Sequence, residues 1–209
     1  MTEDLRYLLS NNIDLIEYGA LDQLTLSQVH TNLMPKPGNE LLVTRMRDGT
    51  VVNLDGSQVP QLVQKCIDRA DAEGVDGVVV LCTGTFHELS CHVPLIIPQP
   101  MFHAVVKQLA KDKKVGVLAP DPLQVEQVKR WWHDSGVDVV VVSASPYEDM
   151  GAVSSAALEF LSMDVSLICL DCMGYSMQMK RVVAQLTGIP VILPRSLVVR
   201  VANELFGDS

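Results

Sequence analysis

The chain has 209 residues and a net charge of −9. Hydrophobic residues make up 48% of it and charged residues 20%, which excludes a disordered tail and predicts a buried core. An acidic surface repels phosphate backbones, and the densest basic run, Lys111, Lys113 and Lys114, is typical of a helix C-terminus. We therefore expect no nucleic-acid partner.

The sequence also favours a cytoplasmic location. No apolar run approaches the roughly 20 residues that a bilayer span requires, so we expect no membrane partner. The opening residues, Met1-Thr2-Glu3-Asp4, lack the basic and then apolar order of a signal peptide. Five cysteines without framework spacing predict reduced thiols, as in the cytosol.

Alternating apolar runs and helical patterns predict an α/β fold. Continuous apolar runs are typical of parallel strands that are covered on both faces, and they occur at 77–81, 115–119, 138–142 and 165–170, with shorter ones at 13–18, 95–97 and 191–193. Helical periodicity occurs at 58–73, 123–135, 152–162, 177–186 and 196–206. Strands that alternate with helices in this way predict a doubly wound parallel sheet.

One segment departs from this alternation. Two extended stretches, 40–46 and 50–54, flank Arg47-Asp48-Gly49, and Asp-Gly between extended runs predicts an antiparallel β-hairpin. The hairpin is either a surface decoration or a lid or dimer contact. The sequence leaves the oligomeric state open and is compatible with a homo-oligomer.

An internal repeat predicts that the chain arose by duplication. Residues 93–110 align with 189–206 at an offset of 96, and the identical pairs include Pro94 with Pro190 and Pro98 with Pro194. Upstream of each stretch stands a Cys-x-Gly turn, Cys82-Thr83-Gly84 in the first half and Cys172-Met173-Gly174 in the second. Chance similarity between apolar strands is the alternative explanation.

The repeat predicts two pseudo-symmetric doubly wound lobes. The second half starts with the strand at 115–119, whereas the first starts with a helical piece at 2–9, so we expect the first lobe to lack its opening strand. We assign 1–98 to the first lobe, with the hairpin at about 40–54 and with completion by a C-terminal helix at about 196–209. The second lobe is 99–195.

Two cysteines are the candidate catalytic residues. Cys82 and Cys172 both follow a predicted strand, and ligands bind in the crevice beyond the carboxyl ends of parallel strands. A glycine two residues after each cysteine lets backbone N–H groups approach an anion. Two thiols that face one cleft suit a two-base proton transfer next to a carboxylate, so the expected partner is a small carboxylate ligand.

Three stretches of the chain are distinctive. They are Leu-Ile-Cys-Leu-Asp-Cys-Met-Gly-Tyr at 167–175, Ile-Pro-Val-Ile-Leu-Pro-Arg-Ser from 189, and Val-Val-Val-Leu-Cys-Thr-Gly-Thr at 78–85. In these stretches the chain resembles the AroM family. AroM proteins are similar to the aspartate/glutamate/hydantoin racemases, which have two lobes with one catalytic cysteine each. The resemblance implies a cofactor-independent racemase or isomerase with Cys82 and Cys172 as acid and base. Expected substrate contacts are Thr83, Gly84, Thr85, Gly174, Tyr175 and Ser176.

A non-catalytic ligand-binding or interaction protein that retains the cleft is the other functional hypothesis. Cys66 and Cys169 fall in apolar patterns and are interpreted as structural. A Cys169–Cys172 redox pair conflicts with the roughly 10 Å that three strand residues span. The spacing of His87, Cys91 and His92 matches no known zinc pattern, so we expect no metal. The sequence has no Gly-x-Gly-x-x-Gly or phosphate-loop pattern, so we expect no cofactor.

Overall fold

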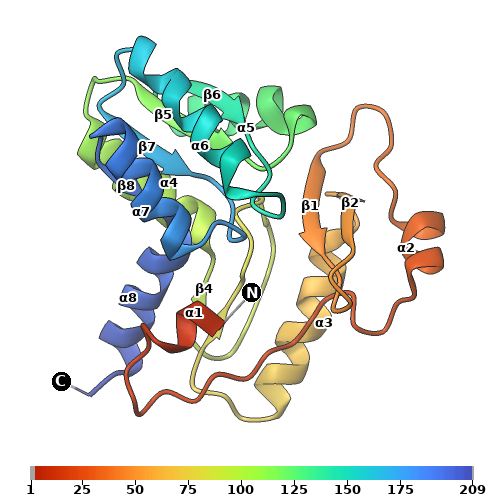
Figure 1. Cartoon of the computed structure of the whole chain (residues 1–209). Helices are drawn as coiled ribbons and strands as arrows, with labels where there is room; N and C mark the ends of the chain where they lie inside the picture. The colour runs from red at the N-terminus through yellow and green to blue at the C-terminus, as the bar shows by residue number, and fades with distance from the viewer. Residues whose placement is uncertain (1–2, 209) are drawn as a thin grey trace. The chain divides into compact units, whose positions relative to one another are not determined.

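The computed structural model describes residues 3–208, which form two compact units (Figure 1). The first unit contains Leu81–Thr83 and the described parts of Met1–Ile13 and Pro98–Ser209. The second contains Asp14–Val80 and Gly84–Ile97. The assignment of residues to two lobes made from the repeat stays a prediction.

A four-stranded parallel sheet is the centre of the first unit (Figure 1). Its strands lie in the order β6-β5-β7-β8, with β5 at Val115–Ala119, β6 at Val139–Ser143, β7 at Leu167–Leu170 and β8 at Val191–Ile192. The chain leaves β5 toward one side for β6 and then returns to the other side for β7. This arrangement confirms the predicted α/β class and places a topological switch point beside β5.

Helices cover both faces of this sheet. On one face, α4 (Pro98–Ala110) and α5 (Val125–Asp134), which a 3₁₀ turn at Pro122–Gln124 precedes, pack on Val115, Val117 and Leu167. On the other, α6 (Met150–Glu159), the 3₁₀ turn Phe160–Ser162 and α7 (Met177–Thr187) pack on Leu118 and Ile168. Alternate residues of each strand face opposite cores, which explains why the strands are apolar throughout.

The C-terminal helix α8 (Pro194–Phe206) belongs to the same unit. It packs on α4 and on the short helix α1 (Glu3–Arg6). Asn203 on α8 holds the N-terminal segment, because its Oδ1 accepts a hydrogen bond from Ser10 N (3.0 Å) and its Nδ2 donates one to Leu8 O (2.8 Å).

The second unit contains the predicted hairpin. Strands β1 (Leu41–Arg45) and β2 (Val51–Asp55) pair antiparallel around Gly49, whose φ of 93° is the left-handed conformation that favours glycine. Helix α3 (Val59–Ala72) confirms the helix predicted over 58–73, whereas α2 (Leu26–Asn32) was not predicted. The Thr25 side chain accepts from Gln28 N and forms a capping box, which was the missed signal for α2.

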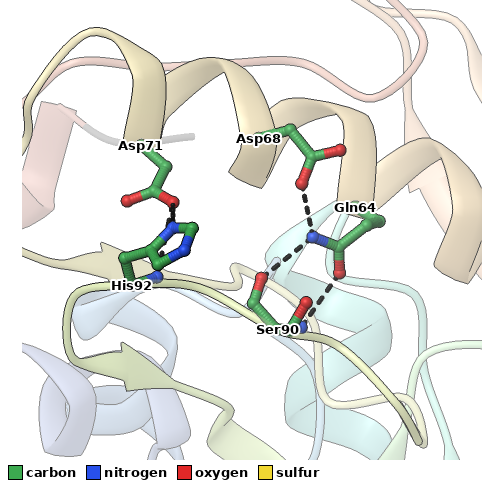
Figure 2. Close-up of polar contacts among 5 residues, drawn as sticks. All are labelled: Gln64, Asp68, Asp71, Ser90 and His92. Atoms are coloured by element: carbon green, nitrogen blue, oxygen red, sulfur yellow. Dashed lines mark hydrogen bonds and ion pairs between the residues drawn. The ribbon is translucent and has the colours of Figure 1, made fainter.

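A short parallel pair, β3 (Val78–Val79) and β4 (Leu95–Ile96), completes the second unit. The loop between these strands is tied to α3 at two points (Figure 2). Gln64 Nε2 donates to Ser90 O (2.9 Å), and Ser90 N donates to Gln64 Oε1 (3.0 Å). Two turns of helix further along, Asp71 Oδ2 lies 2.5 Å from His92 Nδ1.

The predicted strand at 13–18 was wrong. This segment has no strand conformation and lies in none of the three sheets formed by residues 3–208. In the second half, β6 is held by its ladder with β5. Among the described residues ahead of the hairpin, the only elements are helices, so no strand corresponding to β5 is present there to pair with 13–18. An apolar run without a partner strand does not form a β-strand, because its backbone groups lack inter-strand hydrogen bonds.

No helix among the described residues is both long and apolar enough to cross a bilayer.

Candidate active site

The second cysteine turn, residues 172–174, lies at the carboxyl edge of the four-stranded sheet. It follows β7, and Asp171 N donates to Leu118 O of β5 (2.9 Å). The hydroxyl of Tyr175 lies 3.0 Å from Ala119 O and 2.6 Å from Ala144 O, at the ends of β5 and β6. The turn is therefore fixed to three strands at the switch point, where open α/β sheets bind their ligands.

Gly174 allows a close approach between this turn and the loop after β6. A Cβ at Gly174 would lie 2.8 Å from Pro146 Cγ and 2.9 Å from the Tyr147 hydroxyl, so no larger residue fits without movement. The Gly174 N–H also points back and donates to Cys172 Sγ (3.3 Å). Gly174 is therefore required because no side chain fits between this turn and the loop after β6.

Cys82 and Thr83 come close to the second turn from the Leu81–Thr83 segment of the same unit. The Thr83 hydroxyl donates to Asp171 O (3.3 Å) across 88 positions of sequence. The Cys82 thiol lies near enough for its negative form to raise the pKa of Cys172. The structure thus brings the two cysteines predicted as acid and base into one neighbourhood.

Cys172 is a buried thiol that holds its proton. Its side chain is almost fully buried, and burial raises the pKa of Cys172 to about 12. Hydrogen bonds from Gly174 N and the Tyr147 side chain act in the opposite direction, while charge on Cys82 and Asp171 adds to the rise. A thiol in this state donates a proton at neutral pH more readily than it removes one.

A row of buried polar side chains leads from this turn into the core between the sheet, α4 and α5. Trp132 Nε1 donates to Asp171 Oδ2 (2.7 Å), and His103 stacks on the Trp132 ring at 3.8 Å between centroids. His103 Nδ1 lies 2.6 Å from Ser135 Oγ. Burial raises the pKa of Asp171 to about 6 and lowers the pKa of His103 to about 4.

The other residues predicted to contact substrate differ in their burial and in the unit to which they belong. Tyr175 is fully buried, and its hydroxyl serves the strand ends. Ser176 is the N-cap of α7 and accepts from Met179 N (3.2 Å). Gly84 and Thr85 belong to the second unit, where Gly84 is buried and Thr85 is half-buried. The substrate-binding role of these residues stays a prediction.

Sequence reasoning missed four residues around the second turn: Asp171, Trp132, Tyr147 and Arg195. Arg195 is a buried cation at the start of α8, and its Nη1 donates to Tyr175 O (3.2 Å). Asp171 stood within the Leu-Asp-Cys-x-Gly motif and was the available signal. The other three are distant in sequence, and nothing in their local pattern marks them.

The remaining cysteines and histidines form no further site. All five cysteines lie within the described residues, and none of them is joined in a disulfide there. Within residues 3–208, no three His, Cys, Asp or Glu side chains gather as metal ligands would. Cys169 is buried in β7, and burial raises the pKa of its thiol well above the usual value.

Known structures share this fold. A double mutant of arylmalonate decarboxylase in a liganded form has a TM-score of 0.60 at 14% identity, over 74% of this chain and 77% of the other. Allantoin racemase from Pseudomonas fluorescens has a TM-score of 0.57 at 18% identity, over 72% of this chain and 70% of the other. Maleate isomerase from Pseudomonas putida S16 has a TM-score of 0.53 at 16% identity, over 72% of each chain. At these identities the comparison shows that the chain shares the fold of these proteins.

The sequence comparisons identify the family without assigning a reaction. No curated protein matches the chain in sequence. The family model described as AroM protein matches residues 1–206, which is almost the full length and includes both cysteine turns. The chain therefore belongs to the AroM protein family, as its motifs predicted.

Proposed function

We propose that this protein is a cofactor-independent racemase or isomerase that moves a proton on a carbon next to the carboxylate of a small acid. The observation that carries the proposal is the hydrogen bond from Thr83 to the Asp171 carbonyl, because it holds the segment of Cys82 against the turn of Cys172. The racemases and isomerases that share the fold support the same class of reaction.

The two thiols have different roles in the proposed half-reaction. Cys82 is less buried than Cys172 and acts as a thiolate: its sulfur takes the proton as the C–H bond breaks. The electron pair left on carbon is delocalised into the carboxylate as an enolate. The Cys172 S–H, kept protonated by burial, then gives its proton to the opposite face of that carbon. Proton exchange with solvent restores both sulfurs.

The substrate carboxylate would bind at the residues that follow the two cysteines. Thr83 contributes from the first turn, and Gly174 and Ser176 contribute from the second, all within the first unit. Backbone N–H groups at a glycine turn suit an anion, and they stabilise the enolate charge as it develops. Tyr175 contributes by fixing the second turn to the strand ends.

The proposal includes an origin and a location. Duplication of one strand–turn–strand–helix unit would supply one cysteine turn to each of two lobes, 1–98 and 99–195, with the last helix completing the first lobe. The reduced thiols that the mechanism needs suit the cytoplasm.

Deuterium incorporation tests the reaction. The protein is incubated in D₂O with single enantiomers of small amino and dicarboxylic acids, and mass spectrometry follows exchange at the carbon next to the carboxylate. We expect exchange with at least one acid, and its loss in Cys82→Ala and in Cys172→Ala. Cys66→Ala, a cysteine of α3, is the matched control and should retain exchange.

One outcome would overturn the proton-transfer proposal. If the wild-type protein exchanges no acid in the panel but a panel member still slows alkylation of Cys82, the protein is a ligand-binding protein, and the proton-transfer proposal is overturned for that panel.

A further inference from the structure

Asp171 is a buried carboxyl group placed directly before Cys172. Only 4% of the residue is exposed, and its Oδ2 accepts a hydrogen bond from Trp132 Nε1. Its other oxygen, Oδ1, is buried and accepts no hydrogen bond among the described residues. A carboxylate in this position is only half satisfied, so both its charged and its neutral form are accessible near neutral pH.

The groups around this carboxyl are mostly weak acids. Burial is the main cause that raises the pKa of Cys169, Cys172 and Tyr175, and charge on Asp171 adds to the rise in all three. The Thr83 hydroxyl, which bonds the Asp171 carbonyl, also lies near enough to favour the carboxylate. The titratable or charged groups that the described residues bring near it include Cys169 on β7, Cys172 and Tyr175 on the turn, Cys82 and Tyr147 beside the turn, His103 behind Trp132, and Arg195, which bonds the Tyr175 carbonyl.

We infer that Asp171 is a positioning residue whose carboxylate, held by Trp132, adds to burial in keeping Cys172 in its thiol form and so supports its role as proton donor. The assignment of a donor rests on the proposed function, whereas the electrostatic control of the thiol does not. A negative charge beside the sulfur opposes formation of a second negative charge, and a neutral carboxyl removes that opposition.

The direction of the pH effect follows from this coupling. Below about pH 6 Asp171 is protonated, and Cys172 loses its proton more easily. As pH rises through about 6, Asp171 becomes charged and the pKa of Cys172 increases. The logarithm of the Cys172 alkylation rate should therefore rise with pH, flatten near pH 6, and rise again along a lower parallel line.

The experiment measures this profile on the full chain. Cys82→Ala protein is treated with iodoacetamide from pH 5 to pH 9, and mass spectrometry quantifies the alkylated Cys172 peptide. Asp171→Asn keeps an acceptor for Trp132 and removes the charge, so its profile should be one straight line. Above pH 6 that line should lie about tenfold higher. Asp134→Asn, an exposed change at the end of α5, should match the parent protein.

A second readout is independent of whether Asp171→Asn folds. In protein labelled with ¹³C at aspartate carboxyls, the Asp171 signal should titrate near pH 6, and Trp132→Phe should raise that midpoint because the carboxylate loses its donor. A parent profile with no flattening, together with an Asp171 signal that titrates below pH 4, would overturn the inference.

The two proposals fail separately. A flattened alkylation profile without any deuterium exchange leaves Asp171 in control of the thiol and removes the reaction. Exchange that Asp171→Asn leaves unchanged in rate and pH profile removes the effect of Asp171 on the donor Cys172 and keeps the reaction.

Discussion

The strand pairs β3–β4 and β7–β8 are built on the same local plan in different surroundings. Val78 pairs with Leu95 in the first, and Ile168 pairs with Val191 in the second. The carbonyls of Pro94 and Pro190 accept from the first paired residue in each case, at 2.9 Å in both. The helices that follow, α4 and α8, both begin at a proline and have 13 residues. This correspondence supports the proposed duplication.

The two pairs differ in what surrounds them. β7 pairs with β5 as well as with β8, and helices cover both faces of its sheet. The β3–β4 pair is a two-stranded sheet with two residues in each strand. Equivalent local sequence is thus enough to set register, whereas strand length depends on neighbours that supply ladders and cover.

The two cysteine turns differ as well. Leu81 precedes Cys82, and the buried carboxyl of Asp171 precedes Cys172. Only the second thiol therefore has an ionisable neighbour directly before it, which makes two similar motifs chemically unequal.

Loss of a large core side chain should separate the two regions most clearly. Phe160 is buried against Gly116 of β5, where a Cβ would lie 2.8 Å from its ring. Phe160→Ala should lower the free energy of unfolding by about 3–5 kcal/mol. Phe86→Ala, a buried phenylalanine outside the cores of the four-stranded sheet, should cost less in the same urea titration. Equal falls in the free energy of unfolding for the two variants would mean that packing on the four-stranded sheet does not make a buried phenylalanine more stabilising.

The carboxyl of Asp171 should give the second turn its own pH dependence. Its pKa is raised by burial, so its contribution to stability is present below pH 3.8 and is lost as pH rises to about 6. The lowered pKa of His103 acts oppositely, since its contribution is present above pH 6.5 and is lost as pH falls to about 4. The pH-dependent contributions of Asp171 and His103 to the free energy of unfolding therefore largely cancel in the wild-type protein.

Asp171→Asn removes one side of that balance. Between pH 6 and pH 4 its free energy of unfolding should fall relative to wild type by on the order of 3 kcal/mol. Urea denaturation at pH 4, 5, 6 and 7 measures the difference. Parallel curves for the two proteins would show that the Asp171 carboxyl has the same pKa folded and unfolded.

Gly174→Ala should disturb the second turn by a smaller amount. The added methyl group meets Pro146 and Tyr147, and we expect a loss of about 1–3 kcal/mol. In a Tyr147→Ala background the cost should shrink, because half of the obstruction is gone, and a double-mutant cycle reports the coupling. If the effects of Gly174→Ala and Tyr147→Ala on stability were strictly additive, the strain caused by the added methyl group would not come from its contact with Tyr147.

The tie between α3 and the loop of the first half should have the smallest effect. Gln64→Ala removes two exposed hydrogen bonds to Ser90 (Figure 2), at a cost of at most about 1 kcal/mol. Hydrogen exchange should show faster exchange at Ser90 N. Gln61→Ala, one turn earlier on α3 and exposed, is the control. An unchanged Ser90 rate would mean that the loop is held by other contacts.

Much of the fold followed from local pattern. The strand at 115–119, the helix over 58–73 and the hairpin around Gly49 agree with the structure within a residue or two, because each depends on periodicity or turn chemistry that neighbouring residues supply. The run at 13–18 did not, because a strand also needs a ladder partner, and apolar sequence alone does not provide one.

By itself, the sequence determined the class of fold, the family and the two cysteines worth testing, since strand period, motif and repeat are written in adjacent residues. Only the tertiary structure decided what lies around those cysteines. Trp132, Tyr147 and Thr83 reach the second turn from separate elements, and burial beside Asp171 sets the state of the Cys172 thiol. Burial and charge depend on distances between groups that are remote in the chain, and a linear pattern does not contain those distances.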